Sequence, residues 1–141
     1  VVGLGEPGAP DPVVDPFGSG VRLSDDDLRR LVRAGGGSLV PGSLRPWSPA
    51  EILQRILGNI RAWAVGPDRL PTLRWALELT LLLPSHPLDA RRELGLARIR
   101  QGEYAGGADE LARYAEVVAL TDPELADAVR RQARSARARL N

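Results

Sequence analysis

Apolar residues recur at helical spacing from residue 48 onward. Ser48-Pro49-Ala50-Glu51 has the features of a helix start, because serine caps, proline suits the first turn and glutamate can complete a capping box. The apolar positions that follow recur every three or four residues, which predicts a helix with one broad apolar face. These positions are Ile52, Leu53, Ile56, Leu57, Ile60 and Trp63.

Further helices are predicted after breaks at glycine and proline. The first of them is apolar on nearly every side, so we expect it to be buried on both flanks, with Leu77 and Leu81 fully buried. Trp47, Trp63 and Trp75 are expected to pack between helices rather than to line a ligand pocket. The predicted helices cover residues 70–83, 88–100, 104–120 and 123 to the C-terminus.

The N-terminal part of the chain follows a different pattern. Two short β-compatible runs, residues 1–4 and 13–14, flank a segment rich in proline and glycine, which predicts a β-hairpin. A loop is expected over residues 15–20. Ser24, followed by three aspartates, predicts the start of a short helix that ends at the glycines of residues 35–37.

Composition narrows the range of functions. The 19 basic residues, all arginine, and 18 acidic residues give a formal net charge of +1, so neither nucleic acid nor a membrane is expected as a partner. The chain has no cysteine and 1 histidine, which excludes zinc–thiolate and histidine-cluster sites within it, and we expect no cofactor and no metal. The first residues predict no secretory leader. We therefore expect a cytoplasmic protein, and one that is processed or a fragment because the chain opens on Val1.

Several local signals have a structural explanation. Gly3, Gly5 and Gly8 match the spacing of a dinucleotide-binding loop, but the prolines that follow prevent the helix this motif requires. His86, between two prolines, is expected to be a surface turn residue. The acidic run at residues 25–27 is expected to cap a helix rather than to bind calcium. The arginines of the last helix are expected to form a solvated face that suits the helix dipole.

The pattern of the helical segments resembles the tetratricopeptide repeat. The segments that match are Leu94-Gly95, Gln101-Gly102-Glu103-Tyr104, Leu111 and Tyr114, and one hairpin earlier Leu57-Gly58-Asn59. Gly107 stands where the repeat prefers alanine. The resemblance implies a mainly α fold, a tetratricopeptide-like helical hairpin stack of about five helices preceded by a β-hairpin and one short helix. The expected domains are residues 1–47 and 48–141.

The order of motifs along nearly the whole chain resembles the SirB-type transglutaminase-like family, whose C-terminal part carries tetratricopeptide hairpins. The resembling segments are residues 13–17 with Gly20, Leu23-Ser24, residues 48–53, Asn59 and residues 101–104. This resemblance implies that residues 1–47 are the tail end of a transglutaminase-like domain. It also implies that Asp15 takes the third position of a Cys-His-Asp triad whose other members lie outside the chain. The upstream globular domain is then one expected partner.

Two functions are carried forward. The first is a non-catalytic protein–protein interaction module that binds a peptide or a partner domain through the helical stack, with no catalytic residue. The alternative is the C-terminal fragment of a transglutaminase-like or papain-like hydrolase. Resemblance to peptide-binding tetratricopeptide domains assigns the groove to the first helix of each hairpin. The predicted binding residues are Arg55, Asn59, Arg92, Leu96 and Arg100.

Overall fold

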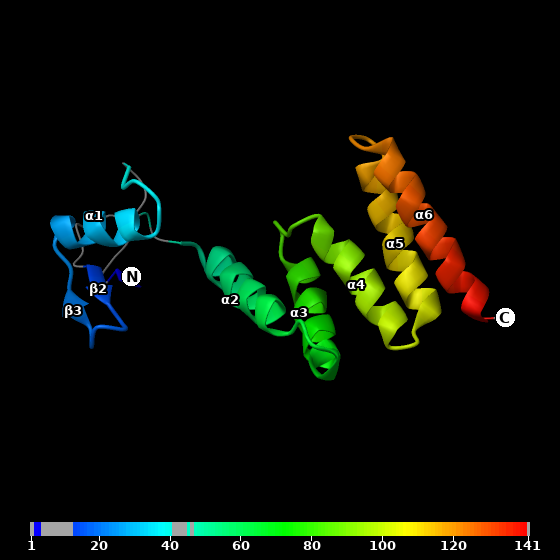
Figure 1. Cartoon of the computed structure of the whole chain (residues 1–141), viewed down its shortest axis with the longest axis horizontal. Coiled ribbons are helices and arrows are strands. Elements are labelled where there is room, and N and C mark those ends of the chain that lie inside the picture. The colour runs from blue at the N-terminus through cyan, green and yellow to red at the C-terminus, as the bar shows by residue number, and fades with distance from the viewer. Residues whose placement is uncertain (1, 4–12, 41–44, 46, 141) are drawn as a thin grey trace. The chain divides into compact units, whose positions relative to one another are not determined.

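A computed structural model describes residues 2–3, 13–40, 45 and 47–140 (Figure 1). The chain divides into two compact units, Val1–Trp47 and Ser48–Asn141. Each unit is described by itself below. Two predictions, the turn at residues 5–12 with its glycines and most of the connector at residues 40–47, lie outside the described residues.

The first unit contains an antiparallel sheet of three short strands in the order β1-β2-β3. Val14 of the central strand pairs with Val2 on one side and with Arg22 on the other. The pairing of β1 with β2 confirms the predicted hairpin. The strands are β1 (Val2–Gly3), β2 (Val13–Asp15) and β3 (Val21–Arg22).

The strand β3 is an addition to the predicted hairpin. Residues 15–20 form a turn, as expected of a loop, in which Gly20 N–H donates to the Asp15 carbonyl at 2.8 Å. Ser19 and Gly20 both have positive φ, 58° and 74°, and this reverses the chain direction. The pattern of the sequence could not predict β3, because two residues carry too little alternation to indicate a strand.

A short helix, α1 (Asp25–Ala34), completes the first unit. The Ser24 hydroxyl accepts from Asp27 N–H, and the Asp27 carboxylate accepts from Ser24 N–H at 2.9 Å, which is a reciprocal capping box. The Ser24 hydroxyl also donates to the Asp27 carboxylate at 2.6 Å. This hydrogen bond, then that from Ser24 N–H and that from Arg30, lowers the pKa of Asp27 to about 2. The predicted capping role of the acidic run is confirmed.

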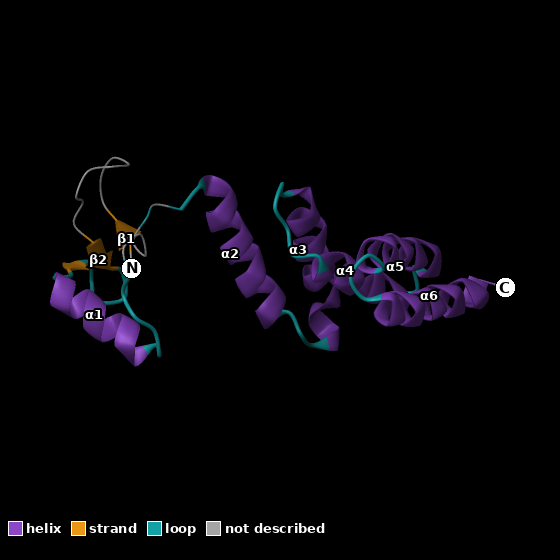
Figure 2. Cartoon of the chain, turned by 90° about the horizontal axis from the view of Figure 1, so that it is seen from above, coloured by secondary structure: helices purple, strands orange, loops and turns teal. Residues whose placement is uncertain are grey.

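Five α-helices form the second unit (Figure 2). The first begins as predicted, with a capping box between Ser48 and Glu51 and Pro49 in the first turn. The helices are α2 (Pro49–Trp63), α3 (Leu70–Leu82), α4 (Asp89–Arg100), α5 (Tyr104–Val118) and α6 (Pro123–Arg137), with the short 3-10 helices η1 (Pro67–Arg69) and η2 (Ala138–Leu140).

Consecutive helices pack against one another along the chain, α2 on α3, α3 on α4, α4 on α5 and α5 on α6. Two buried apolar clusters result. One joins α3 to α4, with Leu77 and Leu94 among its members, and the other joins α5 to α6, with Leu111 and Val129 among its members. Figures 1 and 2 both show α5 and α6 side by side, and the colours of Figure 1 show that they run in opposite directions. The mainly α stack with an N-terminal hairpin and a short helix is confirmed.

The helices α4 and α5 cross closely at two glycines. A Cβ atom on Gly95 would lie 2.9 Å from the Gly107 carbonyl oxygen, and one on Gly107 would lie 2.7 Å from the Gly95 carbonyl oxygen. Both distances are too short for a real side chain. The glycine at position 107, where the repeat prefers alanine, is therefore required by the contact between the two backbones.

One side of α3 is more exposed than predicted. Leu77 is fully buried, as expected, but Leu81 is only half-buried at the edge of the α3–α4 cluster. Trp75 and Leu82 are 51% and 79% exposed. Since α2 and α4 cover only part of this helix, its remaining side faces solvent, and the expectation of burial on both flanks was wrong.

The tryptophans are also more exposed than expected. Trp47, Trp63 and Trp75 keep 45%, 59% and 51% of their surface accessible. They do not lie in the cores between helices, where most of the buried positions are taken by leucine, alanine and valine.

Replacing Leu77 by alanine should lower the free energy of unfolding by about 2 to 5 kcal/mol, because it opens a cavity in the α3–α4 cluster. Leu82→Ala, in the same helix but 79% exposed, is the matched control and should cost less than about 0.5 kcal/mol. Urea denaturation followed by circular dichroism measures both. Equal costs for the two variants would contradict this packing.

Gly107→Ala should destabilise the protein by about 1 to 3 kcal/mol, because the new methyl group forces α4 and α5 apart. Gly58 is the control, since a Cβ added there meets no atom within 4 Å. Gly58→Ala should raise stability by about 0.5 to 1 kcal/mol through helix propensity alone. A neutral or stabilising Gly107→Ala variant in the same urea experiment would show that the crossing is not tight.

Candidate functional site

The predicted binding residues lie on α2 and α4. Arg55 and Asn59 are exposed and stand one turn apart on α2. Arg92, Leu96 and Arg100 follow one another at single-turn spacing along α4. Only Arg100 of these three is exposed, while Arg92 and Leu96 are half-buried.

A salt bridge joins the two helices that carry these residues. Arg61 Nη2 of α2 donates to Glu93 Oε1 of α4 at 2.8 Å, and the Arg61 side chain is only 16% exposed. A direct link therefore holds α2 and α4 together across the first hairpin. Sequence reasoning missed this pair, because the two residues are 32 positions apart and neither belongs to the repeat pattern.

Leu96 is tied to the core more than to the surface. It packs against the buried cluster of α5 and α6 and is only partly accessible. Leu96 is therefore the predicted binding residue with the clearest structural role. Only its exposed edge is accessible to a ligand.

Arg92 lies in a mixed-charge environment at the start of α4. The buried Tyr114 of α5 donates its hydroxyl to Asp89 Oδ1 at 3.1 Å. Burial, then the hydrogen bond to Asp89, raises the pKa of Tyr114, whereas the positive charge of Arg92 acts in the opposite direction. Arg92 Nε is buried and has no hydrogen-bond partner among the described residues. Its guanidinium thus sits close to the Tyr114–Asp89 pair.

The residues of α2 and α4 around the salt bridge carry an excess of positive charge. Four arginines, at positions 55, 61, 92 and 100, accompany two acids, Asp89 and Glu93. Each acid has a donor, Tyr114 for Asp89 and Arg61 for Glu93. Since the charge of Arg61 is balanced by Glu93, the excess of positive charge comes from the other three arginines.

A second set of charges forms a continuous chain of ion pairs through α3, α4 and α5. Arg98 of α4 is its centre, with Nη2 at 3.0 Å from Glu78 of α3 and Nη1 at 3.6 Å from Glu110 of α5. Arg74 continues the chain from Glu78, at 2.9 Å, to Glu103 in the turn before α5. The chain holds three successive helices together.

Glu110 is the most buried acid of this chain, with 7% of its side chain exposed. Arg91 and Arg113 approach it at 2.7 and 3.0 Å, in addition to Arg98. A carboxylate at this depth requires such partners, because an unpaired buried charge is strongly destabilising. The ion pairs of these residues stabilise the fold, so we do not treat the residues as candidates for ligand binding.

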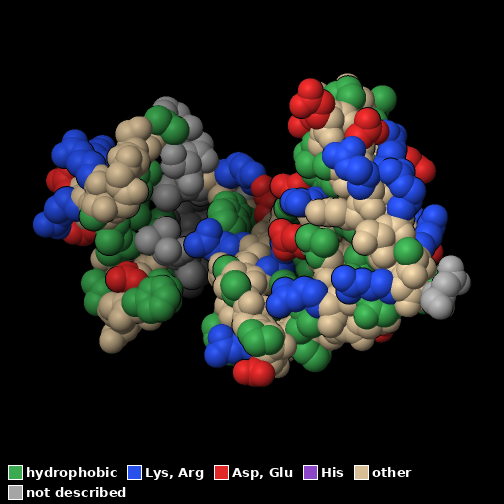
Figure 3. Space-filling model, turned by 45° about the vertical axis from the view of Figure 1, so that its right-hand side comes forward, with side chains coloured by type: hydrophobic (Ala, Val, Ile, Leu, Met, Phe, Trp, Pro, Cys, Tyr) green, Lys and Arg blue, Asp and Glu red, His purple; other side chains and the backbone are tan. Residues whose placement is uncertain are grey.

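The arginines of α6 carry a further positive surface. Arg130 pairs with Asp127 at 2.9 Å and Arg137 with Asp109 of α5 at 2.7 Å. Figure 3 shows basic side chains spread over the visible face of the last helices, with acidic side chains between them. This mixture is typical of a solvated face.

The single histidine lies in the turn that follows α3. His86 Nδ1 lies 3.0 Å from the Leu83 carbonyl oxygen, which can only accept, so this nitrogen carries the proton. The ring is half-buried in the turn between α3 and α4. This local bond explains its presence without a catalytic role.

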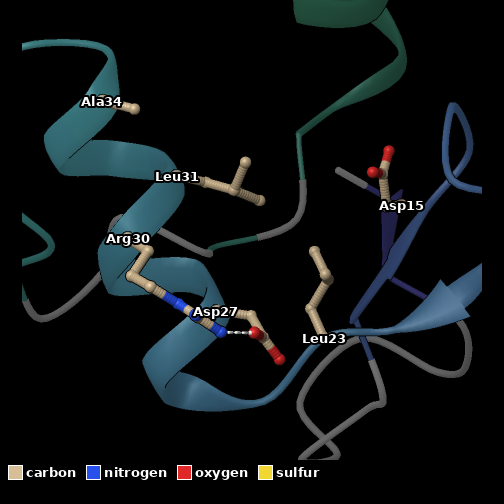
Figure 4. Close-up of a pocket in the computed structure, with 6 residues that line it drawn as sticks. All are labelled: Asp15, Leu23, Asp27, Arg30, Leu31 and Ala34. Atoms are coloured by element: carbon tan, nitrogen blue, oxygen red, sulfur yellow. Dashed lines mark hydrogen bonds and ion pairs between the residues drawn. The ribbon is translucent and has the colours of Figure 1, made fainter.

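In the first unit, Asp15 lines a shallow depression of about 340 Å³ between the sheet and α1 (Figure 4). Leu23, Leu31 and Ala34 supply the apolar lining, and Asp27 and Arg30 pair with each other at its edge. One carboxylate oxygen of Asp15 accepts from Phe17 N–H at 2.9 Å. This bond shapes the turn between β2 and β3.

The described residues contain no group of three histidine, cysteine or acidic side chains placed to hold a metal ion. None of the helices in the described range has the length and apolar content that a bilayer crossing would need.

Comparison with known proteins shows the family of this chain. The chain belongs to the tetratricopeptide repeat family, which matches it over residues 60–141. Repeat domains of this family generally mediate protein–protein interaction and are generally non-enzymatic. No solved structure matches the chain.

Two curated relatives are UPF0162 proteins of Xylella fastidiosa, from strains 9a5c and Temecula1. They are 33% and 32% identical to this chain over 112 residues, which covers 74% of this chain and 40% of each relative. The chain thus spans less than half of the length of these relatives. Their names state no activity and give no support to the SirB-type or transglutaminase-like assignment, which stays a prediction.

Acid should weaken the ion-pair chain through Glu78. The hydrogen bond from Arg74, then that from Arg98, lowers the pKa of Glu78 below its ordinary value, against an opposing effect of burial. The pair therefore stabilises the fold fully above about pH 4.3, the ordinary glutamate value, and this contribution is lost as pH falls through the lowered pKa.

Urea denaturation of the wild type and Glu78→Gln at pH 7 and at low pH measures this contribution. The variant should be less stable at pH 7, and the two proteins should converge as the pH falls. The exposed Glu116→Gln variant is the control and should follow the wild type at every pH. A constant difference between wild type and Glu78→Gln at all pH values would contradict the assignment.

Proposed function

We propose that this chain is a non-catalytic interaction module that binds an acidic peptide, or an acidic segment of a partner domain, along α2 and α4. The observation that carries the proposal is the Arg61–Glu93 salt bridge, which joins the two helices that bear the predicted binding residues. Membership of the tetratricopeptide repeat family supports the general role. Stacked helical hairpins present extended surfaces that suit peptides.

Arg55 and Asn59 are the residues on α2 that we assign to the ligand. An exposed guanidinium can hold a carboxylate through two parallel hydrogen bonds, and an amide one turn away can donate to or accept from a peptide backbone. Arg100 of α4 is also exposed and adds a second cation. Arg92 and Leu96, which are half-buried, then contribute mainly by shaping the surface between them.

The rival function, the C-terminal part of a transglutaminase-like hydrolase, would require Asp15 to orient a histidine. Its carboxylate already accepts from Phe17 N–H in the β2–β3 turn. We therefore propose a structural role for Asp15 in this turn.

Titration with short peptides that end in an acidic residue and a free carboxylate tests the proposal. Arg55→Ala should weaken binding roughly tenfold and reduce its salt dependence, because one charged hydrogen-bond donor is lost. Arg134→Ala removes an exposed arginine from α6 and should leave the affinity unchanged. If neither affinity nor salt dependence changes in Arg55→Ala, this surface is not an anion-binding site.

A further inference from the structure

The solvent-facing side of α3 is uncharged. Trp75 and Leu82 are 51% and 79% exposed, and Thr72 and Leu79, which lie on the same side of the helix, are half-buried. We refer to these four residues as the outer face of α3. Large apolar side chains that remain accessible in one patch are typical of a surface that binds a partner.

The charges of α3 lie outside this face and are already paired. Arg74 and Glu78 are the two charged residues of this helix, and Arg74 Nε donates to Glu78 Oε1 at 2.9 Å. Glu78 also accepts from Arg98 of α4, at 3.0 Å. The outer face therefore offers no charge of its own to a charged partner, and a partner that buried charges against it would leave them without counter-charges.

The spacing of the outer face is the same when it is read from either end. Thr72, Trp75, Leu79 and Leu82 follow one another at intervals of three, four and three residues. Alternating intervals of three and four are those of the seam between two packed helices. Because the order of intervals is symmetric, this face can pack on an identical face that runs in the opposite direction.

A two-fold axis at the height of Leu77 brings the four positions into register. Thr72 then lies opposite Leu82 of a second copy, and Trp75 lies opposite Leu79 of that copy. Each layer thus combines a larger and a smaller side chain, so the two faces can interdigitate. The antiparallel direction also places the helix dipoles of the two copies in opposite senses, which is favourable.

The size of the outer face sets the strength of such a contact. The helix has 13 residues and is therefore about 20 Å long. One side of a helix of this length buries less than the roughly 800 Å² per partner of a standard interface. Pairing through α3 is therefore expected to be weak and to depend on protein concentration.

We propose that the chain forms a weak homodimer through the outer face of α3, in which the two helices pack antiparallel around Trp75 and Leu79. This face is uncharged, and its spacing is complementary to itself, so a second copy satisfies it along its whole length. The residues assigned to the peptide lie on α2 and α4, so the two proposals can fail independently.

Sedimentation equilibrium of the full chain, from about 1 to 500 μM, tests for the dimer. The wild type should change from monomer to dimer over this range. Leu82→Arg should raise the dissociation constant at least about tenfold, because it buries a charge in the contact. Leu120, 86% exposed in the turn after α5, provides the matched control, and Leu120→Arg should dimerise like the wild type. Circular dichroism checks that both variants are folded.

Cross-linking tests the direction of the two helices. The chain has no cysteine, so a disulfide can form only between introduced residues. A mixture of Thr72→Cys and Leu82→Cys should give a covalent dimer under mild oxidation, because the two positions face each other across the contact. Leu82→Cys alone should give little, since antiparallel packing separates residue 82 of the two copies by about 15 Å, too far for a disulfide.

Three outcomes would overturn the proposal. The first is a wild type that stays monomeric at about 500 μM, which would show that this face does not bind a second copy. The second is a dimer that Leu82→Arg and Leu120→Arg affect equally. The third is cross-linking of Leu82→Cys alone that is as efficient as that of the mixture, which would exclude the antiparallel register.

Discussion

The crossing of α4 and α5 at Gly95 and Gly107 sets the distance on which the second unit depends. With no side chain at either position, the two backbones approach until the carbonyl oxygen of each glycine lies only 2.7 to 2.9 Å from where the Cβ of the other would be. This closeness lets Leu111 fill the space beside Gly95. Because interiors are close-packed, a larger separation here would loosen every contact that α5 makes with α6.

That separation also places charged side chains within reach of one another. Arg98 of α4 contacts Glu78 of α3 and Glu110 of α5 at the same time. The resulting chain of ion pairs occupies one side of α4, whereas Glu93 and its bridge to Arg61 of α2 lie on another. One side of α4 thus serves the cohesion of the stack, and the other carries the residues that we propose to bind a peptide. A single helix separates the structural charges from the candidate binding charges.

The two ends of the helical stack, α2 and α6, differ in how much apolar surface they expose. Two-helix repeats bury their apolar faces by stacking, so an end that exposes apolar side chains calls for a further layer. The polar outer face of α6 needs none, while the exposed side of α3 remains accessible in the second unit, with Trp75 and Leu82. Accessible apolar side chains of α2 are Ile52, Leu53, Ile56 and Trp63.

The sequence by itself determined the helices, their caps and the repeat. Capping boxes and apolar spacing are local signals, so Ser24, Ser48 and the buried Leu77 could be predicted from neighbouring residues. Tertiary structure alone decided which apolar faces stay exposed, because a helix that is apolar all round does not indicate how many neighbours cover it. It also decided the Arg61–Glu93 bridge and the need for glycine at position 107, since both depend on contacts between helices that are distant in the sequence.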